Sequence, residues 1–252
     1  MHTLNFKIPV EDQDYPLWSD YVVSQISAIM QEAIDRGHNR ILISTNLKRG
    51  LPLENINKVA GPFVEAWALE TFENISSDPD NKYKLIHVEA GARLDPYDVI
   101  LQFKRTNEKE DYISSNVDVK ATAEDIPTSG KSPNIISYGR IRTAYVEDPD
   151  YLFIILSLKH KVYSEKDKET GMTNGIMEVR SCSVYDVKYI SEKDLSYNPA
   201  LGTGQLQIRD IHYVEAVRRT AWEFCRLFDH KFIASNGEEA FEKLACKLGW
   251  VK

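Results

Sequence analysis

The chain has 252 residues, of which 42% are hydrophobic and 27% charged, a composition ordinary for a soluble globular protein with a sizeable core. Its formal net charge of −7 argues against a basic coat for nucleic acid, but it leaves a nucleic-acid enzyme open, because metal-binding carboxylates count as negative. The longest apolar run (151–158) is too short to span a membrane and the N-terminus lacks a signal-peptide pattern, so we expect a cytoplasmic protein.

Two helices are predicted in the first third of the chain. Apolar residues recur every three to four positions over 16–36, and Gly37 follows in a position that ends a helix. A second helix is predicted over 62–75, because Pro62 suits a first helical position. This second helix carries Glu65 near its start.

The pattern then changes to that of strands. Three segments are rich in β-branched and aromatic residues, at 83–90, 97–103 and 112–120. The polar stretch TNEKED separates the last two and predicts a turn, so these strands are expected to form a hairpin. A hairpin brings Asp98 at one strand end back beside Asp118 at the other, and Lys120 points to the same face as Asp118.

The rest of the chain predicts a mixed architecture. We expect a helix over 133–146, a strand buried on both faces over 151–158, further strands at 176–190 and 204–214, and two final helices at about 217–230 and 237–248. There is no internal repeat and no obvious linker. The predicted fold is therefore α/β (α+β), with one domain over 1–252 in which helices flank a mixed central β-sheet.

Two carboxylates and one ammonium at the open end of a hairpin suit a metal site. Mg²⁺ favours one or two carboxylates plus water, and a nearby lysine can hold or help deprotonate a water molecule. Glu65 offers a further carboxylate. The alternative is structural, since acids and lysines are common at strand ends and the spacing alone does not decide. The charge pattern is suggestive, with eight acids and three bases over 65–98 but three bases and no acids over 128–146.

Four blocks resemble a known family in the same order. The segments DVILQF (98–103) and NVDVK (116–120) resemble the PD-(D/E)xK nuclease motif, although Tyr97 precedes Asp98 and breaks the "PD" dipeptide. The blocks GPFVEAW (61–67), SGKSPNIIS (129–137) and SYNPALGTGQLQIRD (196–210) resemble type II restriction endonucleases of the HpaI and HincII kind. The resemblance covers about Gly61 to Trp222.

This resemblance implies a restriction-endonuclease-like fold and Mg²⁺-dependent hydrolysis of DNA within a restriction-modification system. Asp98, Asp118 and the Val119 carbonyl would bind the metal. Lys120 would position and activate the attacking water, and Glu65 would be an outer or second-metal ligand. By the same resemblance the enzyme would be a homodimer that cuts both strands of a short palindrome, of the GTTAAC kind, to blunt ends with 5′-phosphates.

Base recognition needs other residues, and the segments 128–146 and 196–210 supply them. Asn and Gln amides can read adenine, and Lys can read guanine. Helical spacing predicts that Asn134, Tyr138 and Arg142 face DNA together. The glutamines equally suit exposed strand positions with no function. The predicted DNA-binding residues are Ser129, Gly130, Lys131, Ser132, Asn134, Tyr138, Asn198, Gln205 and Gln207.

Two other functions compete with the restriction endonuclease. A repair or junction-resolving nuclease of the same superfamily would prefer nicks, mismatches or junctions over intact duplex. A non-catalytic DNA-binding protein would use the carboxylates only structurally. In that case Asp118→Ala or Lys120→Ala would leave every activity unchanged.

Overall fold

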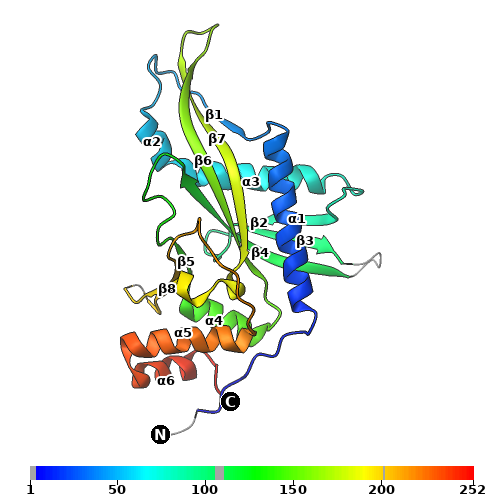
Figure 1. Cartoon of the computed structure of the whole chain (residues 1–252), viewed down its shortest axis with the longest axis vertical. Helices are drawn as coiled ribbons and strands as arrows, with labels where there is room; N and C mark the ends of the chain where they lie inside the picture. The colour runs from blue at the N-terminus through cyan, green and yellow to red at the C-terminus, as the bar shows by residue number, and fades with distance from the viewer. Residues whose placement is uncertain (1–3, 106–110, 201) are drawn as a thin grey trace. The chain divides into compact units, whose positions relative to one another are not determined.

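The computed structural model describes residues 4–105, 111–200 and 202–252 (Figure 1). The chain divides into two compact units. The larger unit comprises Asp20–Gly130 and Ile154–Val184, and the smaller unit comprises Met1–Ser19, Lys131–Phe153 and Tyr185–Lys252. The single domain expected over 1–252 stays a prediction.

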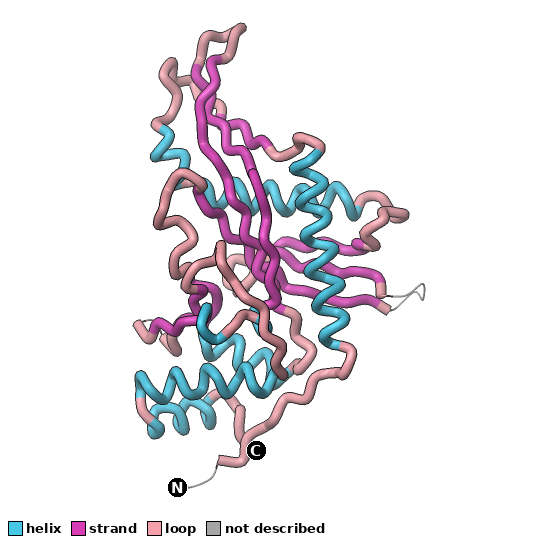
Figure 2. Tube along the Cα trace, in the orientation of Figure 1, coloured by secondary structure: helices cyan, strands magenta, loops and turns pink. Residues whose placement is uncertain are grey.

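A six-stranded sheet forms the centre of the larger unit. The β1–β7, β2–β3 and β3–β4 pairs are antiparallel. The two longest strands, β6 and β7, run side by side (Figure 2). The first residues of β6, from Phe153 to Leu158, are all buried, which confirms the strand expected to be covered on both faces. Across the sheet the order is β1 (Arg40–Ile43), β7 (Thr173–Asp186), β6 (Phe153–Lys166), β4 (Tyr112–Ala123), β3 (Val99–Lys104) and β2 (Leu85–Ala90).

Helix α3 (Ala60–Ser76) packs against β2 and β4 and brings its own residues close to the hairpin (Figure 1). Val64, Ala68 and Phe72 recur every four residues on its buried face. Each large apolar side chain so buried stabilises the fold by roughly 1.5–3 kcal/mol. The preceding helices are α1 (Tyr15–Asp35) and the short α2 (Leu53–Lys58).

The smaller unit holds a three-stranded antiparallel sheet and three helices. A capping box starts α5, in which the Thr220 hydroxyl accepts from the Glu223 N–H at 3.1 Å and the Glu223 carboxylate accepts from the Thr220 N–H at 2.7 Å. Helix α5 packs against α4, α6 and β8 (Figure 1). The elements are β5 (Asn134–Ser137), α4 (Tyr138–Glu147), η1 (Val187–Tyr189), η2 (Glu192–Asp194), β8 (Leu195–Asn198), β9 (Gln205–Ile208), α5 (Ala221–Asn236) and α6 (Glu238–Lys247).

A buried charged cluster joins α4 to α5. The Tyr138 hydroxyl donates to Asp229 Oδ1 at 2.5 Å, and Arg142 Nε donates to the same oxygen at 3.2 Å. The Arg142 guanidinium lies 5.4 Å from the ring centre of Trp222 and 5.1 Å from that of Trp250. Because Arg142 and Asp229 are almost fully buried, removing Asp229 would leave the Arg142 charge without its ion-pair partner, whereas Asp229 also accepts from Arg226 Nη1 at 3.0 Å.

The hairpin predicted for β3 and β4 is confirmed, and most other expected elements are present with shifted ends. Residues 106–110 of its expected turn lie outside the described residues. The helix predicted from 62 begins at Ala60, and the strand predicted over 204–214 is limited to Gln205–Ile208. The helix predicted over 133–146 is wrong at its start, since Asn134–Ser137 is a strand and α4 begins only at Tyr138.

The physical reason for this last difference lies in β9. Ile135 and Ile136 are both buried, and Asn134 and Ser137 are paired with residues of β9. The Tyr138 N–H donates to the Gly204 carbonyl, just before β9, at 3.0 Å. A helix that began earlier would need this N–H for a hydrogen bond within the helix. Strand pairing thus overrides the helical spacing of Asn134, Tyr138 and Arg142.

Candidate active site

The register of the β3–β4 hairpin brings the two predicted carboxylates together. Val99 is paired with Val117, and Asp98 comes directly before β3. Asp98 therefore lies at the start of β3 beside β4, close enough to Asp118 for the charge of Asp98 to raise the pKa of Asp118. The Asp98 N–H donates to the Val117 carbonyl at 2.9 Å, which ties Asp98 to β4 one residue before β3 begins.

The side chains of this pair make specific contacts. Asp98 Oδ2 accepts from the Val119 N–H at 2.7 Å, and Asp118 Oδ1 accepts from Lys120 Nζ at 2.6 Å. The other oxygen of Asp118, Oδ2, is buried and has no hydrogen-bond partner among the described residues. A buried acceptor without a donor is costly unless a cation or proton satisfies it.

Burial dominates the electrostatics of this site. It raises the pKa of Asp118 to about 7, and the nearby Asp98 carboxylate acts in the same direction, whereas Lys120 opposes both. Burial also raises the pKa of Glu65. The Asp98 charge raises this pKa further, and Lys120 lowers it, which places Glu65 within reach of both charges. A proton or a cation is therefore favoured among these carboxylates.

Gly91 holds Asp98 in place and was not singled out by the sequence. Its N–H donates to the Asp98 carbonyl at 2.7 Å. A Cβ at this position would lie 2.3 Å from the Tyr97 carbonyl oxygen and 3.2 Å from that of Asp98, a distance that no side chain can occupy without moving the backbone. The glycine in EAGARLDPYD was the available signal, but a single glycine before a loop is not specific.

The donor set fits a hard divalent cation. Two neighbouring carboxylates supply oxygen ligands, one of them with a buried unpartnered oxygen. The N–H and C=O of one extended residue point to the same strand edge, so the Val119 carbonyl faces the side of Asp98. Among the described residues no cluster of three or more His, Cys, Asp or Glu side chains is suited to a metal, so Glu65 does not complete such a cluster.

The smaller unit brings four predicted recognition residues onto one sheet. In β9, Gln207 is paired with Asn134 of β5 on one side and with Ser196 of β8 on the other. Gln205 is likewise paired with Ser137 and Asn198. Leu206 and Ile208, which alternate with the two glutamines along β9, are fully buried, so the glutamines occupy the opposite face. We call these six residues the amide face; it holds no charged side chain.

The other predicted recognition residues are placed differently. The Ser129 hydroxyl accepts from the Ala123 N–H at 2.7 Å, which fixes the loop after β4. Gly130 has a φ of +84°, as a left-handed turn requires. Lys131 forms an ion pair with Asp210, a partner that no local sequence pattern indicates because it is distant in the chain.

Tyr138 is fully buried against Asp229, so the prediction that Tyr138 faces DNA is wrong.

Comparison with known proteins decides the family. The family model of the type II restriction endonuclease HpaI matches residues 2–248. The type II restriction enzyme HpaI of Haemophilus parainfluenzae is 57% identical over 224 residues, which cover 89% of this chain and 87% of that protein. The chain belongs to the HpaI family of type II restriction endonucleases.

Membership of the HpaI family confirms the predicted fold class and enzyme class. The mixed sheet with flanking helices is a restriction-endonuclease-like architecture, and the activity is that of a DNA-cleaving hydrolase. Type II restriction enzymes generally need a divalent cation, in agreement with the donor set at Asp98 and Asp118. Within the described ranges, no helix is long and apolar enough to cross a membrane.

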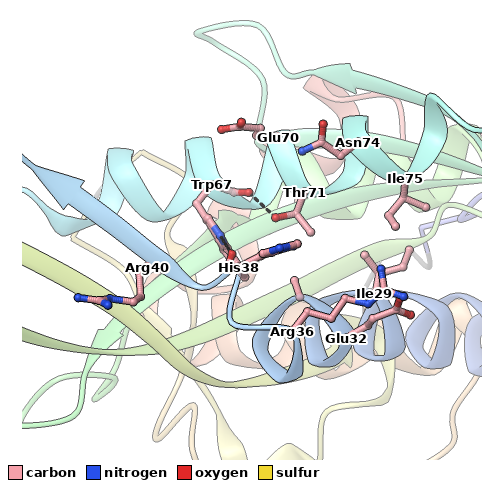
Figure 3. A pocket seen from close by; sticks show the side chains of 11 residues that line it. Ile29, Glu32, Arg36, His38, Arg40, Trp67, Glu70, Thr71, Asn74 and Ile75 are labelled. Atoms are coloured by element: carbon pink, nitrogen blue, oxygen red, sulfur yellow. Dashed lines mark hydrogen bonds and ion pairs between the residues drawn. The ribbon is translucent and has the colours of Figure 1, made fainter.

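This member of the HpaI family also has a cavity of about 570 Å³ between α1 and α3 (Figure 3). No residue predicted for the active site lines it. Some of its polar groups pair with one another: Arg36 bonds Glu32 at 2.5 Å, and Trp67 Nε1 donates to the His38 carbonyl at 2.8 Å. Thr71 donates to the Trp67 carbonyl along the helix. These contacts belong to the packing of α1 against α3.

Proposed function

We propose that this chain hydrolyses both strands of double-stranded DNA at a short palindrome, using Mg²⁺, and leaves 5′-phosphates. The observation that carries the proposal is the neighbouring pair Asp98 and Asp118 with Lys120 Nζ 2.6 Å from Asp118, in a chain of the HpaI family. By family resemblance the palindrome is GTTAAC-like and is cut to blunt ends. Since the substrate is DNA inside a cell, we keep the cytoplasm as the proposed location.

Asp98, Asp118 and the Val119 carbonyl would hold the Mg²⁺ ion. The Asp118 Oδ2 atom supports this assignment, because it is a buried acceptor that needs a positive partner. When bound, Mg²⁺ supplies positive charge for the phosphate oxygens and for the attacking water. Asp98 is oriented for the same role by the Val119 N–H, which fixes one of its oxygens.

Lys120 would orient the attacking water and stabilise charge that develops on the phosphate. Its side chain is about one quarter exposed, so the ammonium lies at the boundary between the buried carboxylate and solvent. An ammonium there has three donors and bonds Asp118 with one of them. The remaining donors are available to a water or phosphate oxygen, in line with electrostatic rather than covalent catalysis.

Glu65 would act as an outer or second-metal ligand. It lies on α3, which packs on β4, and its carboxylate is influenced by both Asp98 and Lys120. Its raised pKa means that, without a cation nearby, it holds a proton more readily than an exposed glutamate, which agrees with an outer rather than a central position in the metal site.

The amide face would read bases. Phosphates are best met by charged groups, whereas base edges in the major groove are read by amides and other uncharged donors and acceptors. Asn134, Asn198, Gln205 and Gln207 supply amides, and the two serines add hydroxyl groups. The neighbouring Ser129, Gly130, Lys131 and Ser132 would follow the DNA backbone or adjoining bases.

A homodimer would match the palindrome. Two identical half-sites are related by a two-fold axis, and two copies of the chain related by the same axis place one active site on each strand. Sedimentation of the protein with a DNA duplex of one site should show two chains per duplex. One chain per duplex would contradict the dimer.

Digestion of phage DNA with Mg²⁺ tests the function directly. Discrete bands whose sequenced ends share one palindrome, blunt ends and 5′-phosphates are expected. Overhanging ends would contradict the blunt cut but keep the enzyme class. A smear or a preference for nicked or branched DNA would overturn site-specific cleavage in favour of the junction-resolving alternative.

Active-site variants then test the residue roles. Asp118→Ala and Lys120→Ala should abolish cleavage, with a loss of at least about 100-fold for the lysine. Asp125→Ala is the matched control, since Asp125 is an exposed acid in the loop after β4. Full activity of the Asp118 variant would show that the carboxylates are structural.

A further inference from the structure

Gln207 is the central residue of the amide face. Its Nε2 atom donates to Asn134 Oδ1 at 2.9 Å and to the Ser132 carbonyl oxygen at 3.2 Å. Register pairing of Asn134 with Gln207 across β5 and β9 brings the two side chains together. The bond therefore joins two residues that are 73 positions apart in the chain.

The Ser132 carbonyl settles which way both amides point. A backbone carbonyl can only accept a hydrogen bond, so the Gln207 atom that faces it must be the amide nitrogen. That nitrogen carries two hydrogens, and the second one is directed at Asn134, which must then present its oxygen. As a result the Asn134 Nδ2 group and Gln207 Oε1 are left without partners among the described residues.

The backbone around Ser132 is held in the conformation that this arrangement requires. Ser132 has a φ of +48°, an uncommon left-handed value for a residue other than glycine. Its N–H donates to the Arg209 carbonyl at 3.0 Å. The preceding residue, Lys131, forms an antiparallel β-bridge with Asp210 through the backbone and an ion pair with it through the side chains. Strained residues of this kind persist where the surroundings hold them, often at ligand-binding sites.

We propose that Gln207 is a positioning residue that locks the Asn134 amide, so that Asn134 can only donate to a base edge and Gln207 can only accept from one. The inference rests on the proposed function and deepens it. A free asparagine amide can turn over and read either a donor or an acceptor. The locked Asn134 instead selects an acceptor, such as the N7 atom of a purine, and Gln207 Oε1 selects a base amino group.

A double-mutant cycle on the full-length enzyme tests the coupling. Asn134→Ala and Gln207→Ala should each lower kcat/KM on the specific site by roughly 10- to 100-fold. The kcat/KM of the double variant should be only slightly lower than that of the less active single variant. The reason is that the first substitution already frees the remaining amide to turn, so removing that amide changes little more. Multiplied losses would overturn the proposal. Asn198 and Gln205 are the matched control pair, with no bond between their side chains, and their losses should multiply.

Gln207→Glu tests the orientation itself. Glutamate keeps the size of the side chain but has no N–H to offer, so the Asn134 amide is free to turn its nitrogen inward. Replacing each purine of the site in turn by its 7-deaza analogue should slow wild-type cleavage about 10-fold or more at one position. That loss should disappear in Gln207→Glu. An equal loss in both proteins would overturn the lock.

The DNA-free protein separates this proposal from the proposed function. With glutamine side chains labelled by ¹⁵N, the Gln207 NH₂ group should exchange slowly with solvent in the wild type and quickly in Asn134→Ala. Fast exchange in both would overturn the lock even in an active enzyme. A wild type that cuts no DNA but shows slow exchange would overturn the base reading and the proposed function, while the amide bond itself would stand.

Discussion

Replacing Asp118 by asparagine should make the metal-free protein more stable while it abolishes cleavage. The wild-type carboxylate is 4% exposed, one of its oxygens lacks a hydrogen-bond partner among the described residues, and the Asp98 carboxylate lies nearby. In the absence of a cation these features make ionised Asp118 unfavourable for folding. Asparagine has nearly the same shape and no charge, so the variant keeps the packing and removes the electrostatic penalty.

The magnitude follows from the pKa of Asp118. The ordinary value is 3.8, and burial raises it to about 7 in the folded protein. Each pH unit between these values corresponds to about 1.4 kcal/mol, so ionised Asp118 costs on the order of 4 kcal/mol. The folded state binds more protons than the unfolded state between about pH 4 and pH 7. Wild-type stability should therefore fall as pH rises through this window and level off above it.

Urea unfolding in EDTA at several pH values between 4 and 8 measures this. We expect the free energy of unfolding of Asp118→Asn to exceed that of the wild type by about 2–4 kcal/mol at pH 8, after allowing for the lost Lys120 contact. Near pH 4 the two free energies should be equal. The control is Asp125→Asn, which removes an exposed acid and should shift stability little at any pH. A difference between Asp118→Asn and wild type that is independent of pH, or a less stable variant at pH 8, would refute the reasoning.

Three further predictions concern neighbouring residues. Lys120→Met should raise the pKa of Asp118 above about 7, because the ammonium lowers it, so the fall in metal-free stability should extend to higher pH in the same titration. Gly91→Ala should move the segment that carries Asp98 and lower kcat by at least about 10-fold, as single-turnover cleavage would measure. Tyr138→Phe should cost about 1–2 kcal/mol in urea unfolding, because its buried hydroxyl bonds a buried carboxylate.

Control variants accompany the glycine and tyrosine predictions, and each of the three predictions has a result that would contradict it. Gly61→Ala is a suitable partner for the glycine variant, since its added Cβ would only touch Glu65 Oε1 at 3.6 Å and leave cleavage intact. Tyr213→Phe matches the tyrosine variant, because Tyr213 is 78% exposed. Equal effects of the paired variants, or a Lys120→Met protein with the wild-type stability profile against pH, would contradict the assigned contacts.

The carboxylate pair was predictable because it depends on local rules. Strand period and a hairpin fix which side of a strand a residue takes and which residue lies opposite, so Asp98, Asp118 and Lys120 followed from spacing and hairpin return. The spacing did not decide whether Asp118 is buried or whether one of its oxygens lacks a partner. Both depend on β6 and α3, which lie next to β4, and no local sequence pattern encodes those contacts.

The recognition segment illustrates the opposite case. Residues 133–146 carry a helical spacing, and the predicted helix is wrong at its start because β9 (Gln205–Ile208), distant in the chain, pairs with Asn134 and Ser137. Non-local strand pairing routinely overrides local propensity. The same error placed Tyr138 on a DNA-facing helix surface, whereas its ring and hydroxyl belong to the buried cluster with Asp229.

An acidic chain that acts on a polyanion needs its charges in specific places. The net charge is −7, so any long-range attraction to phosphate must come from local basic segments such as 128–146 rather than from the total charge. Recognition through uncharged amides avoids desolvating ions and depends on the direction of each donor and acceptor. The proposed base reading by the amide face needs amides that cannot turn over, and the two hydrogen bonds of Gln207 would restrain the amides of Gln207 and Asn134 in this way. The proposed metal site follows the same logic, since the ionised form of buried Asp118 would become favourable only with a cation bound, which would tie the charge needed for cleavage to the metal.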